Sequence, residues 1–255
     1  MREEHREGEN RLHKRKKTHR LYATIVLALG IVIICLSFLL LFYVQKIEIK
    51  GNQYCSDKTI VSAIQNDRFS INTVYVLAKY SSGKGEIPAG LNSMKVSMKN
   101  PWTLSVTVEE KQSIGYFEHK KKKVYFDEDG LVLIHGLAIV QGVPLVEGVN
   151  FKNIKQYSYL SCENTNVFEE ISTIKQEFEK NELKINRIVY IDDRIYVYIG
   201  KKCISFGTEV TAEKVAQISP IMKKLGKKKG TLHLENYSGG NETITFAIGE
   251  FPKEN

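Results

Sequence analysis

The stretch LYATIVLALGIVIICLSFLLLFYV, residues 21–44, decides the fold class, because it holds 24 consecutive residues without a charge. As a helix at about 1.5 Å per residue it is roughly 36 Å long, against a hydrocarbon core of about 30 Å. It lacks the polar face that a helix at the surface of a soluble protein shows. Tyr22 and Tyr43 stand near its two ends, where interfacial aromatic residues belong. We therefore predict a transmembrane helix over residues 21–44.

The flanks of this stretch indicate an uncleaved anchor. A secretory signal peptide has an apolar region of about 7–15 residues followed by small residues at the cleavage site. This run is longer, and it continues into Gln45 and Lys46 without such a site. Seven basic residues lie within about 15 positions before the run, and three within a similar distance after it. The positive-inside rule then predicts a single-pass type II protein with a cytoplasmic basic tail, residues 1–20, and an extracellular remainder.

The net charge of the chain follows the same division. Its 255 residues include 37 Lys and Arg against 29 Asp and Glu, which gives +8. The first 20 residues contain eight basic and four acidic side chains, so half of the excess precedes the membrane helix. Hydrophobic residues at 42% and charged residues at 26% exclude a wholly disordered chain and a multi-span membrane protein. No fold or aromatic pattern typical of nucleic-acid binding accompanies the positive charge, and we expect no nucleic-acid partner.

Residues 45–112 have the pattern of a small α+β domain. Ile47 and Ile49 alternate with charged residues, as in a strand with one buried face. A helix is predicted from Ser56, a capping residue, and a second over residues 72–79. Residues 94–98 and 103–109 alternate again and flank a turn at Asn100-Pro101. The predicted order is strand, helix, helix, strand, strand.

The rest of the chain is predicted to be richer in strands. Their expected positions are residues 115–117, 124–126, 131–134, 144–148, 185–191, 195–199, 231–234 and 242–248. Helices are predicted over residues 165–180 and 211–225. Asn166 and Glu169 suggest a variant of the capping box for the first of these helices. Pro220 predicts a kink or a break in the second.

Several short segments resemble catalytic or metal-binding motifs, but each lacks residues that the motif requires. Residues 81–84 match Ser-x-x-Lys, but the Ser-Asp-Asn and Lys-Thr-Gly elements of that chemistry are missing. The acidic turn at residues 127–130 departs from a calcium loop, because its Gly is misplaced and no Glu closes it. The six His residues show no catalytic zinc spacing. We therefore expect no catalytic residue, no metal site and no cofactor.

Two features keep more than one interpretation. The lysine runs 120–123 and 227–229 stand at predicted turns, so they are either solvated clusters or sites for anionic wall polymer or lipid headgroups. Cys55, Cys162 and Cys203 follow the membrane helix, and their odd number allows at most one intrachain pair. We interpret them as small apolar positions and leave their pairing open.

Short motifs along the chain resemble the bacterial cell-division family FtsQ, called DivIB in Gram-positive bacteria. The motifs lie at residues 44–52, 100–111, 125–130, 144–148, 206–207 and 230–234. They occur in the family's order, and the resemblance covers about residues 10–248. Two features depart from the family pattern. His233 stands where the family usually has Asp, and the loop at residues 79–90 is less typical.

The resemblance implies an α+β fold with an N-terminal transmembrane helix. A β-α-α-β-β POTRA domain would follow at residues 45–112, and then a larger mixed β domain with two helices at residues 113–234. Residues 235–255 would form a C-terminal strand and tail.

The resemblance also implies a non-catalytic divisome scaffold at the septum. Such a scaffold binds DivIC/FtsB-like and FtsL-like division proteins, and through them acts indirectly on the septal peptidoglycan synthase complex. The partner-facing segment maps to about residues 232–246, where an edge strand can accept a strand from a partner. The candidate contact residues are Leu232, Leu234, Asn236, Ser238, Thr243 and Phe246.

Other interpretations remain open at this point. The partner-facing segment can also be an ordinary closing strand of the β domain. The whole protein can also be an extracellular cell-wall enzyme, or an envelope-biogenesis POTRA protein. Missing nucleophile and metal patterns disfavour the first of these, and the lack of POTRA repeats disfavours the second.

Overall fold

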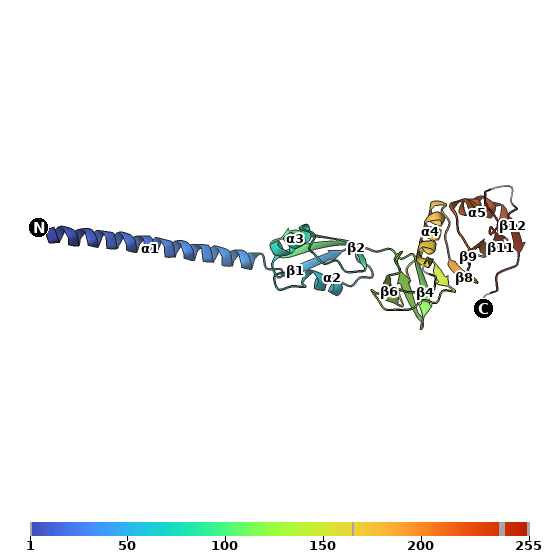
Figure 1. The fold of residues 1–255 in the computed structure, drawn as a ribbon, viewed down its shortest axis with the longest axis horizontal. Coiled ribbons are helices and arrows are strands. Elements are labelled where there is room, and N and C mark those ends of the chain that lie inside the picture. The colour runs from blue at the N-terminus through green and yellow to red at the C-terminus, as the bar shows by residue number, and fades with distance from the viewer. Residues whose placement is uncertain (1, 165, 240–242, 254–255) are drawn as a thin grey trace. The chain divides into compact units, whose positions relative to one another are not determined.

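The structure is a computed structural model that describes residues 2–164, 166–239 and 243–253 (Figure 1). The chain divides into two compact units, Met1–Glu110 and Lys111–Asn255. The five segments predicted from the sequence divide the chain more finely, and their limits stay a prediction. The mixed α+β class is confirmed, with helices and β-sheets in the same chain.

The N-terminal helix α1 (Arg2–Leu41) contains a segment, Leu21–Leu41, that is long and apolar enough to cross a membrane. None of the side chains in this segment is buried within the protein. The helix ends at Leu41, whereas the predicted segment continues to Val44. The reason is that Val44 is buried in the core of the first unit, and its backbone N–H donates to Ile71 O at 2.8 Å.

The first unit has the predicted order of elements after α1. These are β1 (Lys46–Lys50), α2 (Asp57–Ile64), α3 (Thr73–Ser81), β2 (Leu91–Asn100) and β3 (Thr103–Glu110). The strand order in the sheet is β1-β3-β2, with β1 parallel and β2 antiparallel to β3. The β-α-α-β-β prediction is confirmed.

Local sequence explains both short helices of this unit. Ser56 caps α2 by accepting a hydrogen bond from Thr59 N, and Asn72 caps α3 by accepting from Val74 N and Tyr75 N. The helices pack on the sheet through fully buried side chains, which are Ile60, Ile64, Val76, Leu104 and Val106. Capping fixes where each helix begins, and apolar burial holds it on the sheet.

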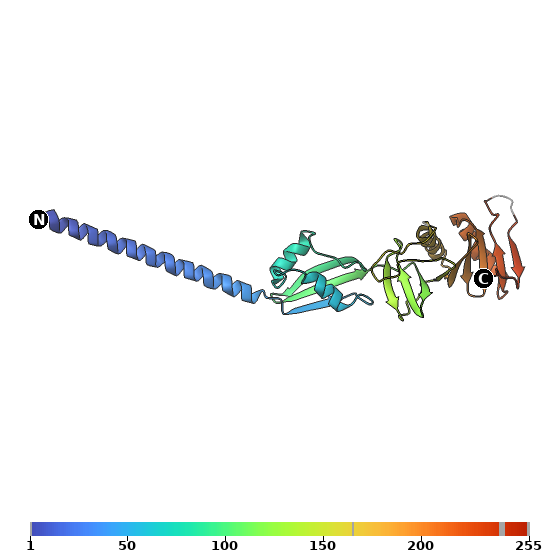
Figure 2. The same cartoon turned by 60° about the horizontal axis from the view of Figure 1, so that its bottom comes forward.

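The second unit is built on one nine-stranded sheet (Figure 2). Its strands are β4 (Gly115–His119), β5 (Lys122–Phe126), β6 (Val132–Gly136), β7 (Leu145–Glu147), β8 (Arg187–Ile191), β9 (Arg194–Ile199), β10 (Lys202–Gly207), β11 (Gly230–His233) and β12 (Thr245–Ile248). Their order across the sheet is β12-β11-β10-β9-β8-β7-β4-β5-β6. The helices α4 (Val167–Lys180) and α5 (Ala212–Leu225) share one apolar core with these strands.

Three sequence expectations in this unit differ from the structure. The strand β10 was not predicted, because its residues form an almost fully buried run without alternation. The capping box is wrong, since the Asn166 side chain makes no cap hydrogen bond. The helix α5 continues through Pro220, so the predicted break is wrong, while the kink predicted as its alternative stays a prediction. Pro220 and Ala216 are exposed, so water can satisfy the carbonyl that the proline leaves without its helical donor.

Two expectations fall partly outside the described residues. The predicted start of α4 at Thr165 is one, and the predicted start of β12 at Glu242 is the other. The lysine run 227–229 stands in the turn after α5 as predicted, whereas the run 120–123 is divided, with Lys122 and Lys123 already in strand β5. Lys120 and Lys121 adopt φ of +49° and +64° in the tight turn between β4 and β5. Cys55 and Cys203 are buried, as small apolar positions should be, whereas Cys162 is half-buried and its thiol donates to Asn164 O at 2.9 Å.

Candidate partner-binding edge of the second unit

The strand β12 lies at one edge of the nine-stranded sheet. It pairs with β11 in an antiparallel register, with Leu232 opposite Phe246 and His233 opposite Thr245. Among the described residues β11 is its one neighbour in the sheet. An edge strand of this kind has backbone donors and acceptors on one side that no neighbouring strand uses.

The register shows which backbone groups of β12 face outward. Gly249 N donates to Lys229 O at 3.0 Å, and this pair continues the β11–β12 ladder by one step. Hydrogen-bonded and non-hydrogen-bonded pairs alternate in an antiparallel ladder, so Thr245 and Ala247 are bonded to β11. The N–H and C=O groups of Phe246 and Ile248 therefore point away from the sheet.

The side chains of Phe246 and Ile248 share one face of the sheet, because they are two positions apart in a strand. Phe246 is half-buried and packs against the main core of the unit. Ile248 is 65% exposed, and Phe251 beyond the strand is also exposed. The outward backbone groups are thus bordered by an apolar side chain that no part of the described core covers.

The six candidate contact residues are distributed between the core and the surface. Leu232 and Leu234 are buried in the main core, so their side chains support the edge from inside. Asn236, Ser238 and Thr243 are exposed, and Phe246 is half-buried. Residues 240–242, which link these positions to β12, lie outside the described part of the chain. The role of all six in binding stays a prediction.

Other contacts fix the turn that follows β11. Leu234 N donates to Ser205 O at 2.8 Å, and Tyr237 N donates to Leu234 O at 3.1 Å. His233 Nδ1 lies 2.9 Å from Glu235 Oε1. The histidine that departs from the family pattern therefore pairs with a carboxylate on the same turn. The exposed Ile248 is absent from the candidate set, although its place in the apolar alternation of the strand was a usable signal.

The second unit also contains a cavity of about 280 Å³. Its lining includes Tyr190 and four acidic residues, which are Glu163, Glu170, Asp192 and Asp193. Burial, and then the Glu170 carboxylate, raise the pKa of Tyr190. No three His, Cys, Asp or Glu side chains among the described residues are placed to hold a metal ion.

No family model matches the chain, and no curated protein matches it. Among solved structures, a match covers 46% of this chain and 95% of the other, at 18% identity and a TM-score of 0.28. That structure is the major extracytoplasmic domain of the trans isomer of the bacterial cell division protein DivIB from Geobacillus stearothermophilus. A TM-score this low does not establish a shared fold, so the fold described above stands on the elements of this chain.

Proposed function

We propose that this protein is a membrane-anchored, non-catalytic scaffold of the cell-division machinery. Its N-terminus lies in the cytoplasm, and the chain that follows the membrane helix lies outside the cell at the division septum. Through DivIC/FtsB-like and FtsL-like partners it acts on septal peptidoglycan synthesis. The observation that carries the proposal is the edge strand β12, whose outer backbone groups at Phe246 and Ile248 are available to a partner strand.

The surrounding features support the individual parts of this proposal. The segment Leu21–Leu41 can anchor the chain in a membrane. The seven basic residues before this segment, against three after it, favour a cytoplasmic N-terminus. The motif order along the sequence resembles the FtsQ/DivIB family, whose members act in division.

Strand addition gives a simple physical account of partner binding. A partner strand beside β12 would exchange main-chain hydrogen bonds with Phe246 and Ile248, and these bonds would supply affinity. Side chains on alternate positions of the partner would meet the exposed Ile248 face or the Thr245 face. Because the edge is at the end of the sheet, the partner would extend the sheet without disturbing the core.

The test compares two variants of the full-length protein in detergent, Phe246→Pro and Phe246→Ala. Both lose the phenyl ring, but only proline loses the outward N–H and fixes φ near −65°. We expect Phe246→Pro to bind the external segment of a DivIC-like partner at least about tenfold more weakly than Phe246→Ala, as for one lost hydrogen bond of about 1.4 kcal/mol.

Unfolding curves of the two variants provide the control. Proline is tolerated at the outward position of an edge strand, so the unfolding midpoints should be similar. Equal affinities of the two variants, measured by titration at equal stability, would show that β12 does not bind the partner by strand addition.

A further inference from the structure

Backbone hydrogen bonds join residues 42–45, where the chain leaves helix α1, to other segments of the first unit. Thr73 N donates to Phe42 O, and Val44 N donates to Ile71 O, each at 2.8 Å. Gln45 N donates to Trp102 O at 2.9 Å. Two loops, residues 66–72 and 100–102, therefore border the chain at the point where it leaves the apolar helix.

These two loops and the helix exit carry large apolar side chains on their surface. Phe69 is 54% exposed, Ile71 52%, Tyr43 49% and Trp102 41%. We call these four residues the membrane-proximal collar. Large apolar side chains gathered on a surface usually mark a place that another apolar phase covers. Here the apolar helix segment ends at Leu41, immediately before the collar.

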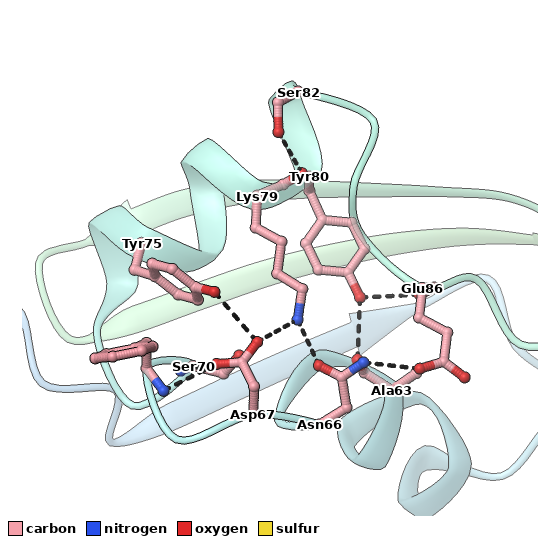
Figure 3. Close-up of polar contacts among 10 residues, drawn as sticks. Ala63, Asn66, Asp67, Ser70, Tyr75, Lys79, Tyr80, Ser82 and Glu86 are labelled. Atoms are coloured by element: carbon pink, nitrogen blue, oxygen red, sulfur yellow. Dashed lines mark hydrogen bonds and ion pairs between the residues drawn. The ribbon is translucent and has the colours of Figure 1, made fainter.

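A polar network holds one loop of the collar in place (Figure 3). Asp67 Oδ1 accepts hydrogen bonds from Phe69 N at 2.8 Å and Ser70 N at 3.0 Å. Asp67 Oδ2 pairs with Lys79 Nζ at 2.7 Å and accepts a hydrogen bond from Tyr75 at 3.3 Å. The Lys79 hydrogen bond is the main cause that lowers the pKa of Asp67 to about 2. The Asp67 carboxylate is thus charged at neutral pH, and its hydrogen bonds hold the loop at residues 66–72 in this conformation.

The network extends from Lys79 in α3 to the segment just after α2 and to the loop that follows α3, as Figure 3 shows. Lys79 also donates to Asn66 Oδ1, and Asn66 Nδ2 donates to Glu86 at 2.7 Å. Tyr80 donates to Glu86 O at 2.9 Å. Because these contacts join α3, the loop at residues 82–90 and the segment just after α2, the loop that carries Phe69 and Ile71 is anchored at several points. Its apolar side chains are presented on a fixed backbone.

Basic side chains accompany the collar. The Arg68 guanidinium lies 4.7 Å from the centre of the Phe69 ring, and the Phe69 and Tyr75 rings are 5.6 Å apart. Lys46 and Lys99 are largely exposed beside the chain exit and the turn before Trp102, and both pair with the Glu48 carboxylate, at 2.9 and 2.8 Å. Aromatic rings together with cationic heads are the combination that suits a membrane interface, where acyl chains meet phosphate groups.

The distance of the collar from the hydrocarbon core indicates which phase contacts its side chains. The headgroup layer is roughly 5–7 Å thick on each side of the hydrocarbon core. The collar loops are hydrogen-bonded to residues 42–45, directly after the apolar segment, so they lie within this layer when the helix spans the membrane. We propose that the collar is a lipid-binding surface whose ligand is the headgroup–acyl boundary of the outer leaflet. This proposal rests on the membrane anchor, and it does not depend on partner binding by β12.

Trp102 allows a direct test, because it is the one tryptophan of the protein. The full chain is reconstituted in vesicles of phosphatidylglycerol and phosphatidylethanolamine, with and without lipids brominated near the top of the acyl chains. We expect blue-shifted Trp102 emission that is quenched by the brominated lipids and protected from aqueous iodide. Emission at the wavelength of a water-exposed tryptophan, with full quenching by iodide, would overturn the proposal.

The matched control moves the tryptophan to the other end of the same sheet. In the double variant Trp102→Phe, Tyr54→Trp, the probe stands beyond the far end of β1, where Tyr54 is also exposed. Its emission should be that of tryptophan in water, with quenching by iodide and none by brominated lipid. If both probes behave as membrane-bound, the collar is not a specific surface and the proposal is wrong.

Two further measurements separate the collar from the anchor and from a protein partner. Flotation of the vesicles reports the anchor alone, so a chain that floats while Trp102 stays in water disproves the collar and leaves the anchor intact. The double variant Phe69→Ser, Ile71→Ser should float equally well but lose most of the blue shift. A collar that binds a protein in place of lipid gives a water-exposed Trp102 in these pure lipid vesicles, which also overturns the proposal.

Discussion

The two edge strands of the nine-stranded sheet, β6 and β12, differ in whether a loop hydrogen-bonds to their outer backbone groups. At the β6 edge, the loop before Leu160 covers the start of the strand: Tyr157 N donates to Val132 O at 2.8 Å and Val132 N donates to Ser158 O at 3.0 Å. Gln156 Nε2 also donates to Leu133 O at 3.1 Å. At the β12 edge, no described residue makes a corresponding contact with the outward groups of Phe246 and Ile248.

This difference suggests why one edge is protected and the other is open. An uncovered edge invites pairing with other chains, and proteins commonly cover it with a loop. The cover at β6 uses Tyr157 at φ +61°, a conformation that a non-glycine residue seldom adopts. The chain thus accepts a strained residue to close one edge. That the other edge stays open is consistent with its use as the binding site of a partner strand.

The largest expected effect concerns the inner support of the open edge. Leu234→Ala should lower the free energy of unfolding by about 2–5 kcal/mol, because Leu234 is fully buried beside the end of β11. Chemical denaturation measures this loss. The exposed Asn236→Ala is the control and should change stability by less than about 0.5 kcal/mol. Similar small losses for both variants would mean that Leu234 does not support the edge.

The second prediction concerns a variant that removes the loop cover from the β6 edge. Tyr157→Pro removes the donor to Val132 O and cannot adopt the observed positive φ, which should cost about 3 kcal/mol locally. We expect the opened β6 edge to cause dimers or larger species in light scattering. Tyr157→Gly keeps the N–H and accepts a positive φ, so its particle size should equal that of the original protein. If Tyr157→Pro also keeps the original size, the loop is not what protects this edge.

The smallest effect concerns a side chain at the open edge. Ile248→Lys places a charge beside the outward backbone groups and should weaken the proposed partner binding by about two- to fivefold, under 1 kcal/mol. Isothermal titration against the external segment of a DivIC-like partner measures the change. The uncharged control Ile248→Thr keeps the β-branched shape and should bind nearly as well as the original protein. An unchanged affinity for Ile248→Lys would place the partner away from this end of β12.

Local chemistry made much of the fold predictable. The caps at Ser56 and Asn72 and the alternation over residues 103–109 are signals that a single chain carries in its own sequence. The strand β10 lacked such a signal, since burial on both faces removes the alternation. The end of the helix before Val44 also depends on tertiary packing, because Val44 is as apolar as the membrane segment that precedes it.

The candidate site was predictable only as a segment. Sequence resemblance could place it near the last strands, but it could not separate the buried Leu232 and Leu234 from the exposed Asn236 and Ser238. That separation requires the register of β11 against β12 and the position of both strands in the sheet. The outward backbone groups of Phe246 and Ile248 carry no sequence signal at all, because every residue has an N–H or C=O group that can face either way.

Amide hydrogen exchange of β12, measured residue by residue by NMR with and without the partner segment, tests the central claim most directly. In the free protein, the amides of Thr245 and Ala247 should be protected by β11, and those of Phe246 and Ile248 should exchange rapidly. On partner binding, the account predicts strong protection of Phe246 and Ile248. Saturated binding with these two amides still exchanging rapidly would contradict it.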